Sequence, residues 1–296
     1  MASGDPVVSL LRADGRELVL GNGEPGAQIT RMYGAEGLGL GPVSFATSPR
    51  LAGNGSVLRG ERVDERELFI PVLLEADDVV ALDSLRESLT VFLSPLDSSE
   101  LVVRVTSPGR DEWRELPVRY AGGLEGDFGD GYHGDWQKVG LKFKALDALW
   151  RGQPVTITKM VDAAYKPFLS ASVEFFPVVL ADSTVAGRIS VDIAGAAPTL
   201  PVWTVTPPGE DLLIQDLSTG ARLYLDGLLP GQVTVDMAQG RVTVASTGEN
   251  LNDRLSLDTR FFALSPGHQE IAFSMVGASS ASRLDLTYTP RYLAGL

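Results

Sequence analysis

Short apolar segments separated by glycine and proline run through almost the whole chain, and this pattern constrains the fold more than any other feature. The 296 residues include 32 glycines and 18 prolines, which is typical of many turns between short strands. Only residues 79–92 show the three-and-four spacing of apolar residues that predicts an amphipathic helix. The sequence therefore predicts a mainly β protein with a single helix.

The length of the chain fits two domains better than one. A single hydrophobic core stops growing at about 250–300 residues, and 296 residues give each of two domains enough length to bury its own core. Residues 151–164 are small and polar, as expected of a linker or of a first strand. We expect an N-terminal domain at residues 1–152 and a C-terminal domain at residues 153–296.

Charge and composition exclude several classes of function. The net charge of −13 repels phosphate backbones and argues against specific nucleic-acid binding. The absence of cysteine removes disulfides, thiolate metal sites and cysteine nucleophiles. The N-terminus has no signal-peptide pattern, and no run approaches the about 18 apolar residues that would span a bilayer. We therefore expect synthesis in the cytoplasm and no membrane insertion.

A strand followed by the single helix is the clearest pattern of the N-terminal half. In the strand predicted at residues 68–74, Pro71 lacks a backbone donor and should lie at a sheet edge or a bulge. Asp77 or Asp78 is the expected N-cap of the helix, and Pro95 should end it. Its apolar stripe comprises Val79, Leu82, Leu85, Leu89 and Phe92. We expect this stripe to cover the sheet of its own domain.

Further strands complete both halves of the chain. In the N-terminal half we predict strands at residues 7–11, 17–20, 101–106, 113–120 and 137–145. This order favours a small barrel or split sheet covered by the helix. In the C-terminal half we predict strands at residues 173–180, 188–193, 202–206, 212–216, 221–225, 232–236, 241–245, 261–264, 270–276 and 283–289. Such a rhythm favours a β-sandwich of jelly-roll type.

The sequence offers little that could carry catalysis. His133 and His268 are the only histidines, each stands in a turn-like segment, and no G-x-S-x-G motif is present. No catalytic residue and no cofactor are therefore predicted. Residues 125–135 gather acidic side chains among glycines, and Asp127, Asp130 and Asp135 are weak calcium candidates because the EF-hand spacing is not met. A solvated turn is the favoured interpretation of this loop.

Two other interpretations of function remain open. A carbohydrate-binding module would need exposed aromatic side chains, and the C-terminal half supplies Trp203, Tyr224, Phe261, Phe262, Tyr288 and Tyr292. Most of these fall inside strand patterns, which favours a place in the core. A glycosidase would need two carboxyl groups at a fixed separation, and sequence spacing does not determine that separation. We rank the glycosidase last.

Several segments together resemble the distal tail proteins of siphophages. In the N-terminal half they are RGERVDERELFIPVLLEA, DSLRESLTVFLSP, ELVVRV and LKFKALDALWRG. In the C-terminal half they are PVWTVTPPG, the stretch LLIQDLSTGARLYLDG with its continuation to residue 255, FFALSPGHQEIAFS and RLDLTYTPRYL. Asp147 and Trp150 match the family's closing turn loosely, and Ala148 stands where the family has proline. The resemblance covers most of the chain through its hydrophobic and turn pattern.

This resemblance implies a structural role in the virion. It implies a split-barrel N-terminal domain and a galectin-like or jelly-roll C-terminal domain. Six copies of the N-terminal domain would form a ring at the distal end of a long non-contractile tail, leaving a channel for DNA. The expected partners are further copies of this chain, the tail-tube protein, the tail-hub protein and receptor-binding or tail-fibre proteins. No catalytic residue is implied.

Two groups of residues are expected to serve such a ring. The apolar face formed by Leu68, Ile70, Val72 and Leu74 is the predicted oligomer interface, because unpaired strand edges and apolar faces are surfaces that head-to-tail contacts use. Glu125, Asp127 and Asp130 would form an acidic loop facing the channel. Repeated around a ring, such a loop would repel DNA phosphates.

Overall fold

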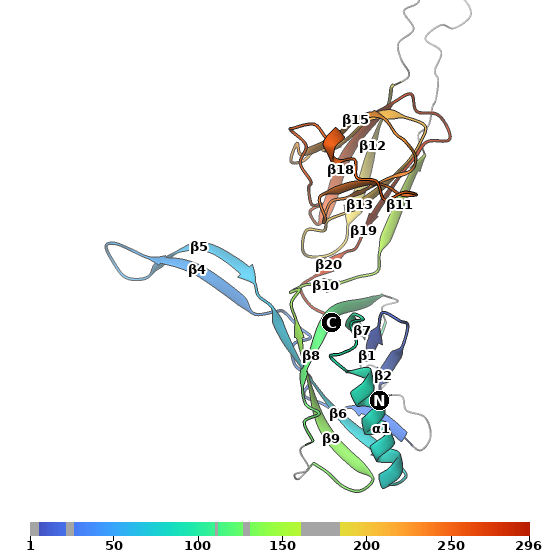
Figure 1. Cartoon of the computed structure of the whole chain (residues 1–296). Helices are drawn as coiled ribbons and strands as arrows, with labels where there is room; N and C mark the ends of the chain where they lie inside the picture. The colour runs from blue at the N-terminus through green and yellow to red at the C-terminus, as the bar shows by residue number, and fades with distance from the viewer. Residues whose placement is uncertain (1–5, 22–26, 110–111, 127–130, 161–183) are drawn as a thin grey trace, which may run out of the picture. The chain divides into compact units, whose positions relative to one another are not determined.

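The computed structural model describes residues 6–21, 27–109, 112–126, 131–160 and 184–296. It divides into two compact units, Met1–Gln153 with Tyr292–Leu296, and Pro154–Arg291 (Figure 1). The segment Tyr292–Leu296, which we had assigned to the second domain, thus packs with the first unit. The assignment of two functional domains, 1–152 and 153–296, stays a prediction.

The first unit is a nearly closed antiparallel barrel with one helix. The strand order is β2-β1-β7-β8-β9-β6-β3, and the amide of Gly21 donates to the carbonyl of Ile29 at 2.7 Å, which links β2 to β3. The elements are β1 (Val7–Arg12), β2 (Glu17–Leu20), β3 (Ala27–Arg31), β4 (Val43–Pro49), β5 (Ser56–Val63), β6 (Arg66–Ala76), α1 (Val79–Phe92), β7 (Leu101–Thr106), β8 (Trp113–Gly122), β9 (Trp136–Ala145), β10 (Trp150–Arg151) and β20 (Arg291–Tyr292).

Period-two alternation builds the core of this barrel. Along β9, Val139, Leu141 and Phe143 are buried, while Lys138 and Lys142 on the opposite face are exposed. The helix α1 covers the sheet as predicted. Its residues Leu82 and Leu89 are buried, Leu85 and Phe92 pack against the same core, and only Val79 of the predicted stripe is exposed.

Asp78 is the N-cap of α1, since its carboxylate accepts a hydrogen bond from the amide of Ala81 at 2.8 Å. The helix ends at Phe92, with Leu93 as its C-cap, shortly before Pro95. Both predicted ends of the helix are therefore confirmed.

The expectation that Pro71 lies at an edge or a bulge is wrong. β6 is an inner strand, paired with β9 on one side and with β3 on the other, and its register with β9 is unbroken at Pro71↔Gly140. The carbonyl of Pro71 accepts from the amide of Met32, one residue past the end of β3. In an antiparallel strand the nitrogen and the carbonyl of one residue face the same neighbour, so the Pro71 nitrogen, which has no hydrogen to donate, also faces Met32. Because Met32 lies past the end of β3, no hydrogen bond between β3 and β6 is lost.

The second unit is a β-sandwich. One sheet has the order β11-β19-β13-β16-β17 and the other β12-β18-β14-β15. The elements are β11 (Val155–Met160), β12 (Thr184–Ile193), β13 (Val202–Thr206), β14 (Glu210–Asp216), β15 (Arg222–Leu228), β16 (Val233–Asp236), β17 (Arg241–Val244), the short helix η1 (Asn252–Arg254), β18 (Gly267–Val276) and β19 (Arg283–Tyr288). The predicted class, a mainly β chain with a split barrel, one helix and a C-terminal sandwich, is confirmed.

One strand prediction differs from the structure. Residues 261–264 form no strand, because Phe262 and Leu264 are buried from an extended segment that makes only an isolated bridge between Thr199 and Leu264. The buried apolar residues of this segment thus gave the sequence pattern of a strand, although the segment forms no hydrogen-bonded ladder. The strand predicted at residues 173–180 lies outside the described residues. β3, β4 and β5 were not predicted at all.

Candidate assembly surface

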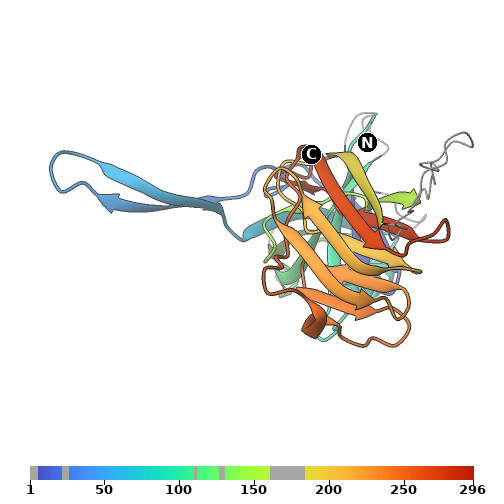
Figure 2. The ribbon, with the colours of Figure 1, turned by 90° about the horizontal axis from the view of Figure 1, so that it is seen from above.

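β4 and β5 form a two-stranded hairpin, residues 43–63, which we call the arm. They pair with each other from Val43↔Val63 to Pro49↔Ser56, and neither strand pairs with any other described segment. Figures 1 and 2 show the arm as a ribbon that leaves the barrel. Gly53 and Gly55 at its tip have φ angles of 105° and 89°, which other residues rarely adopt. The arm therefore has two long open edges.

Apolar side chains on the arm are in contact with solvent. Phe45 is 61% exposed and Leu58 is 55% exposed, while Leu51 near the tip is fully exposed. A two-stranded hairpin alone is only marginally stable in water, and three strands or a packing partner are normally needed. Unpaired edges add free backbone donors and acceptors. The arm thus has the composition and geometry of a segment that completes its packing on another surface.

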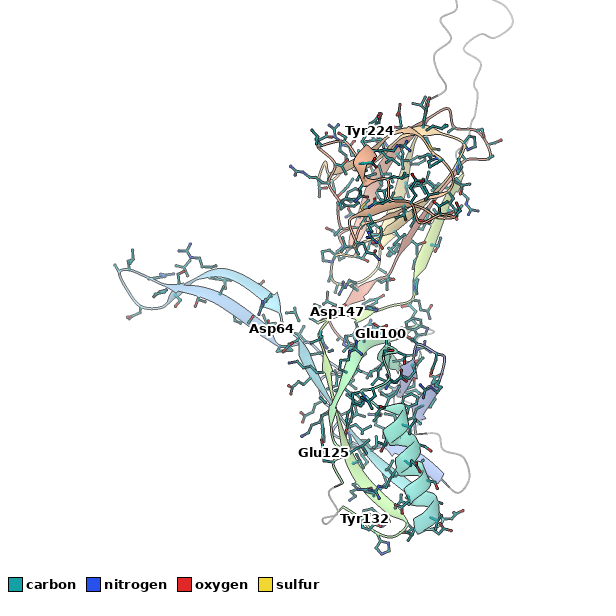
Figure 3. All side chains as sticks on the ribbon, in the orientation of Figure 1. Asp64, Glu100, Glu125, Tyr132, Asp147 and Tyr224 are labelled. Carbon is teal, nitrogen blue, oxygen red and sulfur yellow. The ribbon has the colours of Figure 1, made fainter. Side chains whose placement is uncertain are left out.

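The charge of the arm is opposite to that of the chain. Residues 43–63 contain Arg50, Arg59 and Arg62 against Glu61, three positive charges against one negative, whereas the whole chain carries −13. The guanidinium of Arg62 donates to Asp64 at 2.7 Å at the root of the arm, where Figure 3 labels Asp64. The arm is therefore a basic segment on an acidic chain.

The predicted interface residues do not lie on a surface. Leu68, Ile70, Val72 and Leu74 are each at most 1% exposed and belong to the core of the barrel. Because these side chains are buried inside the barrel, they cannot contact another copy in this fold. The prediction that this face of the strand forms the interface is therefore corrected. Both faces of this strand read as apolar in the sequence, and the sequence pattern did not distinguish the inner one.

The opposite face of β6 is the one that meets solvent. Phe69 and Leu73 are half-buried there, and Phe69 stands opposite Lys142 while Leu73 stands opposite Lys138 on β9. Lysine stems cover apolar surface while their ammonium groups stay in water. An interface through this strand, which stays a prediction, would use these outer residues.

The acidic loop is only partly described, since Asp127 and Asp130 lie outside the described residues. Both carboxylate oxygens of Glu125 accept from the amide of Gly123, at 2.9 and 2.8 Å, which lowers the pKa of Glu125 (Figure 3). Asp135 contacts the imidazole of His133 at 2.6 Å, and this bond lowers the pKa of Asp135. No described group of three acidic, histidine or cysteine side chains could hold a metal ion. The channel-facing and calcium roles stay predictions.

The second histidine lies in an arrangement that the sequence did not reveal. His268 contacts Ser190 at 3.4 Å through Nε2 and Asp192 at 3.2 Å through Nδ1. These three residues share one face of β12 and β18, and the side chain of Asp192 is 86% exposed. Solvent screens such contacts, and a serine nucleophile also needs positioned oxyanion donors in a water-excluded site. The geometry favours a surface hydrogen-bonded cluster over a hydrolase.

Three of the six predicted aromatic residues are buried in the core of the sandwich, and one lines a hollow on its surface. Trp203, Phe262 and Tyr288 are buried in the sandwich. Tyr224 is half-exposed and lines a hollow of about 540 Å³ on the outer face of β14 and β15, where Figure 3 labels it. The other residues that line it are Leu213, Arg222, Ser256, Leu257 and Asp258. Of the predicted stacking residues, Tyr224 is the one that lines this hollow.

Residues 194–292 match the family model of the siphovirus-type tail component, C-terminal domain. A search of curated proteins by sequence finds no match. In the described part of the chain, no helix is both long enough and apolar enough to cross a bilayer.

Solved structures with the same fold include a phage adsorption-apparatus protein and a phage baseplate protein. The Dit protein of phage SPP1, described as a paradigm of the hub adsorption apparatus in phages that infect Gram-positive bacteria, has a TM-score of 0.67 and 17% identity, covering 96% of this chain and 99% of that chain. A chain of the phage P2 baseplate in its activated conformation with Ca has a TM-score of 0.53 and 8% identity, covering 96% and 98%. The predicted resemblance to distal tail and baseplate proteins is confirmed for the fold.

Proposed function

We propose that this chain is a distal tail protein of a siphophage, a structural component without enzymatic activity. In this role, six copies form a ring at the distal end of the tail tube. The observation that carries the proposal is the arm, an exposed two-stranded hairpin that extends from a barrel with the fold of the SPP1 Dit protein. The match of residues 194–292 to a siphovirus-type tail component supports the same role.

In the proposed ring, the arm of each copy contacts the barrel of the next. Such a contact is head-to-tail, because the arm and its receiving surface are different patches, and head-to-tail contacts close into a ring when the rotation allows it. The exposed face with Phe45 and Leu58 would become buried, and the arm's arginines would meet an acidic neighbour. Both changes favour association.

The ring would serve as a connector in the virion. The tail-tube protein would contact one side, and the tail-hub and receptor-binding or tail-fibre proteins would contact the other, after synthesis of the chain in the host cytoplasm. DNA would pass through the central channel without specific binding, because a chain with a net charge of −13 repels its phosphates. The channel-facing acidic loop would contribute to this repulsion.

Sedimentation velocity over a range of concentrations tests the role of the arm. We expect the unmodified chain to form a complex of six copies and the double variant Phe45→Ser with Leu58→Ser to sediment as a single copy. The control is Leu96→Ser with Leu228→Ser, which removes two other exposed leucines outside the arm. The arm is not the interface if its double variant assembles as well as the control.

A second candidate function is carbohydrate binding by the C-terminal sandwich. The specific observation is the hollow lined by Tyr224, with Arg222, Ser256 and Asp258 as hydrogen-bonding groups beside an aromatic ring. Calorimetry against bacterial wall saccharides, after a glycan-array screen, would test it. Binding should be lost in Tyr224→Ala and kept in Tyr33→Ala, which changes a tyrosine that is 92% exposed in the first unit. Absence of any saccharide binding by the unmodified chain would exclude this function.

A further inference from the structure

A buried arginine lies directly beneath the root of the arm. Arg66 is the first residue of β6, three residues after the end of β5, and it is 1% exposed. Its Nη1 donates to the carbonyls of Gly37 at 3.2 Å and Gly39 at 2.7 Å. Its Nη2 donates to the carbonyls of Ala148 at 2.6 Å and Leu293 at 3.0 Å. One of these acceptors, Leu293, is 227 positions from Arg66 in the sequence.

Two of these segments lead directly into the arm. Gly37 and Gly39 precede β4, while Arg66 itself follows β5, so the guanidinium connects the chain on both sides of the hairpin. Gly41 packs so closely that an added Cβ would lie 2.8 Å from Nη2 of Arg66. The amide of Asp64 also donates to the carbonyl of Pro42 at 2.9 Å. The direction in which the arm leaves the barrel therefore depends on this small set of contacts.

The segment Tyr292–Leu296 is the third component of the same cluster. Besides the bond from Arg66 to Leu293, the amide of Gly295 donates to the carbonyl of Leu38 at 2.8 Å, within the loop that precedes β4. Gly295 also packs on the ring of Trp150, where a Cβ would lie 2.8 Å away. Arg114 donates to the carbonyl of Ala294 at 2.7 Å and stacks on the ring of Tyr292. The segment is thus held against the loop that begins the arm.

The chemistry of this cluster suits a rigid joint. A guanidinium presents its donors in a fixed planar arrangement, so four carbonyls that accept from it are held in fixed relative positions. Burial lowers the pKa of Arg66 and outweighs the opposing effect of the Asp147 carboxylate, as expected of a cation surrounded mainly by neutral carbonyls (Figure 3 labels Asp147). A lysine has the same charge but a single nitrogen, and it cannot reach the same four acceptors.

We propose that Arg66 and the segment Tyr292–Leu296 form a root clamp, which positions the arm for docking on the next copy. This inference rests on the proposed function, because it takes the arm as the assembly element. Arg66 acts as a positioning residue, since it fixes the two chain segments between which the arm begins and ends. The segment Tyr292–Leu296 supplies the outer wall of the clamp. Loss of either part frees the direction of the arm while the two strands of the arm stay paired.

A distance measurement within one chain tests the clamp. Because the chain has no cysteine, Asn54→Cys at the arm tip and Ser84→Cys on α1 give a single pair of spin-label sites. Labelled protein is diluted into unlabelled protein, so that electron-electron resonance reports only distances within a chain. We expect a single narrow distance distribution, and loss of that narrow distribution both in Arg66→Lys and in a chain that ends at Arg291.

Two further variants distinguish a specific effect on the direction of the arm from a general loss of stability of the barrel. Arg12 is a matched control, since it is also a buried arginine whose guanidinium donates to three backbone carbonyls, at the C-terminal end of α1, and none of these carbonyls belongs to the segments that flank the arm. Arg12→Lys should lower the melting temperature as much as Arg66→Lys and leave the distance distribution narrow. If the shortened chain fails to fold, Gly295→Ala, which forces the segment away from Trp150, replaces it.

The outcomes are distinct for the clamp and for the proposed function. A narrow distribution in either Arg66→Lys or the chain lacking Tyr292–Leu296, or equal broadening in Arg12→Lys, would overturn the clamp. The distance readout belongs to a single chain and does not require assembly. A chain that never forms rings but loses its narrow distribution in Arg66→Lys would contradict the proposed function and leave the clamp supported.

Discussion

Nε of Arg12 donates a hydrogen bond to the carbonyl oxygen of Phe92, the last residue of α1, at 2.8 Å. Nη2 of the same side chain donates to the carbonyl of Ser94 at 3.0 Å, and Nη1 to that of Ser99 at 2.9 Å. The last carbonyls of a helix have no donor within the helix, and buried ones must find another partner. Arg12 on β1 therefore ties the end of α1 to the barrel.

Replacing Arg12 should destabilise the barrel. Arg12→Lys keeps the charge and leaves at least two of these buried carbonyls without a donor, so the free energy of unfolding should fall by about 2–3 kcal/mol. Urea denaturation followed by circular dichroism measures this. An unchanged midpoint would mean that water replaces the guanidinium without cost, contrary to the burial of Arg12.

The N-cap of the helix gives a smaller effect with an adjacent control. Asp78→Ala removes the acceptor for the amide of Ala81 and should cost about 1 kcal/mol of unfolding free energy. Asp77→Ala removes a neighbouring exposed carboxylate that is not the cap. Equal effects of the two substitutions in the same denaturation experiment would show that charge, and not the capping bond, stabilises this end.

Asp216 in the second unit predicts a dependence of stability on pH. Its buried carboxylate accepts from the amide and hydroxyl of Ser218 at 2.8 and 2.7 Å and from the hydroxyl of Thr219 at 2.6 Å. Burial raises the pKa of Asp216, but these donors outweigh that effect and the pKa lies below its ordinary value. The folded state therefore binds the proton less readily than the unfolded state does.

The sign of the effect follows from linkage. The stabilisation by a carboxylate with a lowered pKa is complete above its unfolded pKa, about 3.9, and is lost as the pH falls through the folded pKa. Asp216→Asn should lower the free energy of unfolding by about 2 kcal/mol at pH 7, and the difference from the unmodified chain should shrink below pH 4. Denaturation at several pH values measures this, with Asp253→Asn, at an exposed site, as the control. A difference that stays constant down to pH 2 would contradict the assignment.

The sequence predicted those parts of the fold that bury one face of an element. β2, β7 and β13 have the predicted bounds, and in β7 and β13 every second residue is a buried apolar one. The helix was predicted for the same reason. In contrast, Leu68 to Leu74 carry apolar residues on both faces, so the pattern predicted a strand without showing which face is internal.

The candidate assembly surface was not predictable in this way. The arm is rich in serine, threonine and glycine and contains few alternating apolar residues, since no layer of its own chain lies beneath it. Phe45 and Leu58 have no partner surface within the described fold that would create a periodic pattern. The role of Arg66 was not predictable either, because its four acceptors are backbone carbonyls, and any residue type supplies a backbone carbonyl.

Electron microscopy of the purified full chain tests the central claim most directly. Class averages of negatively stained particles should show closed rings with six-fold symmetry and a central channel, and Phe45→Ser with Leu58→Ser should abolish them. Particles that remain single copies at every concentration, in a preparation whose circular dichroism shows the folded β structure, would contradict the account.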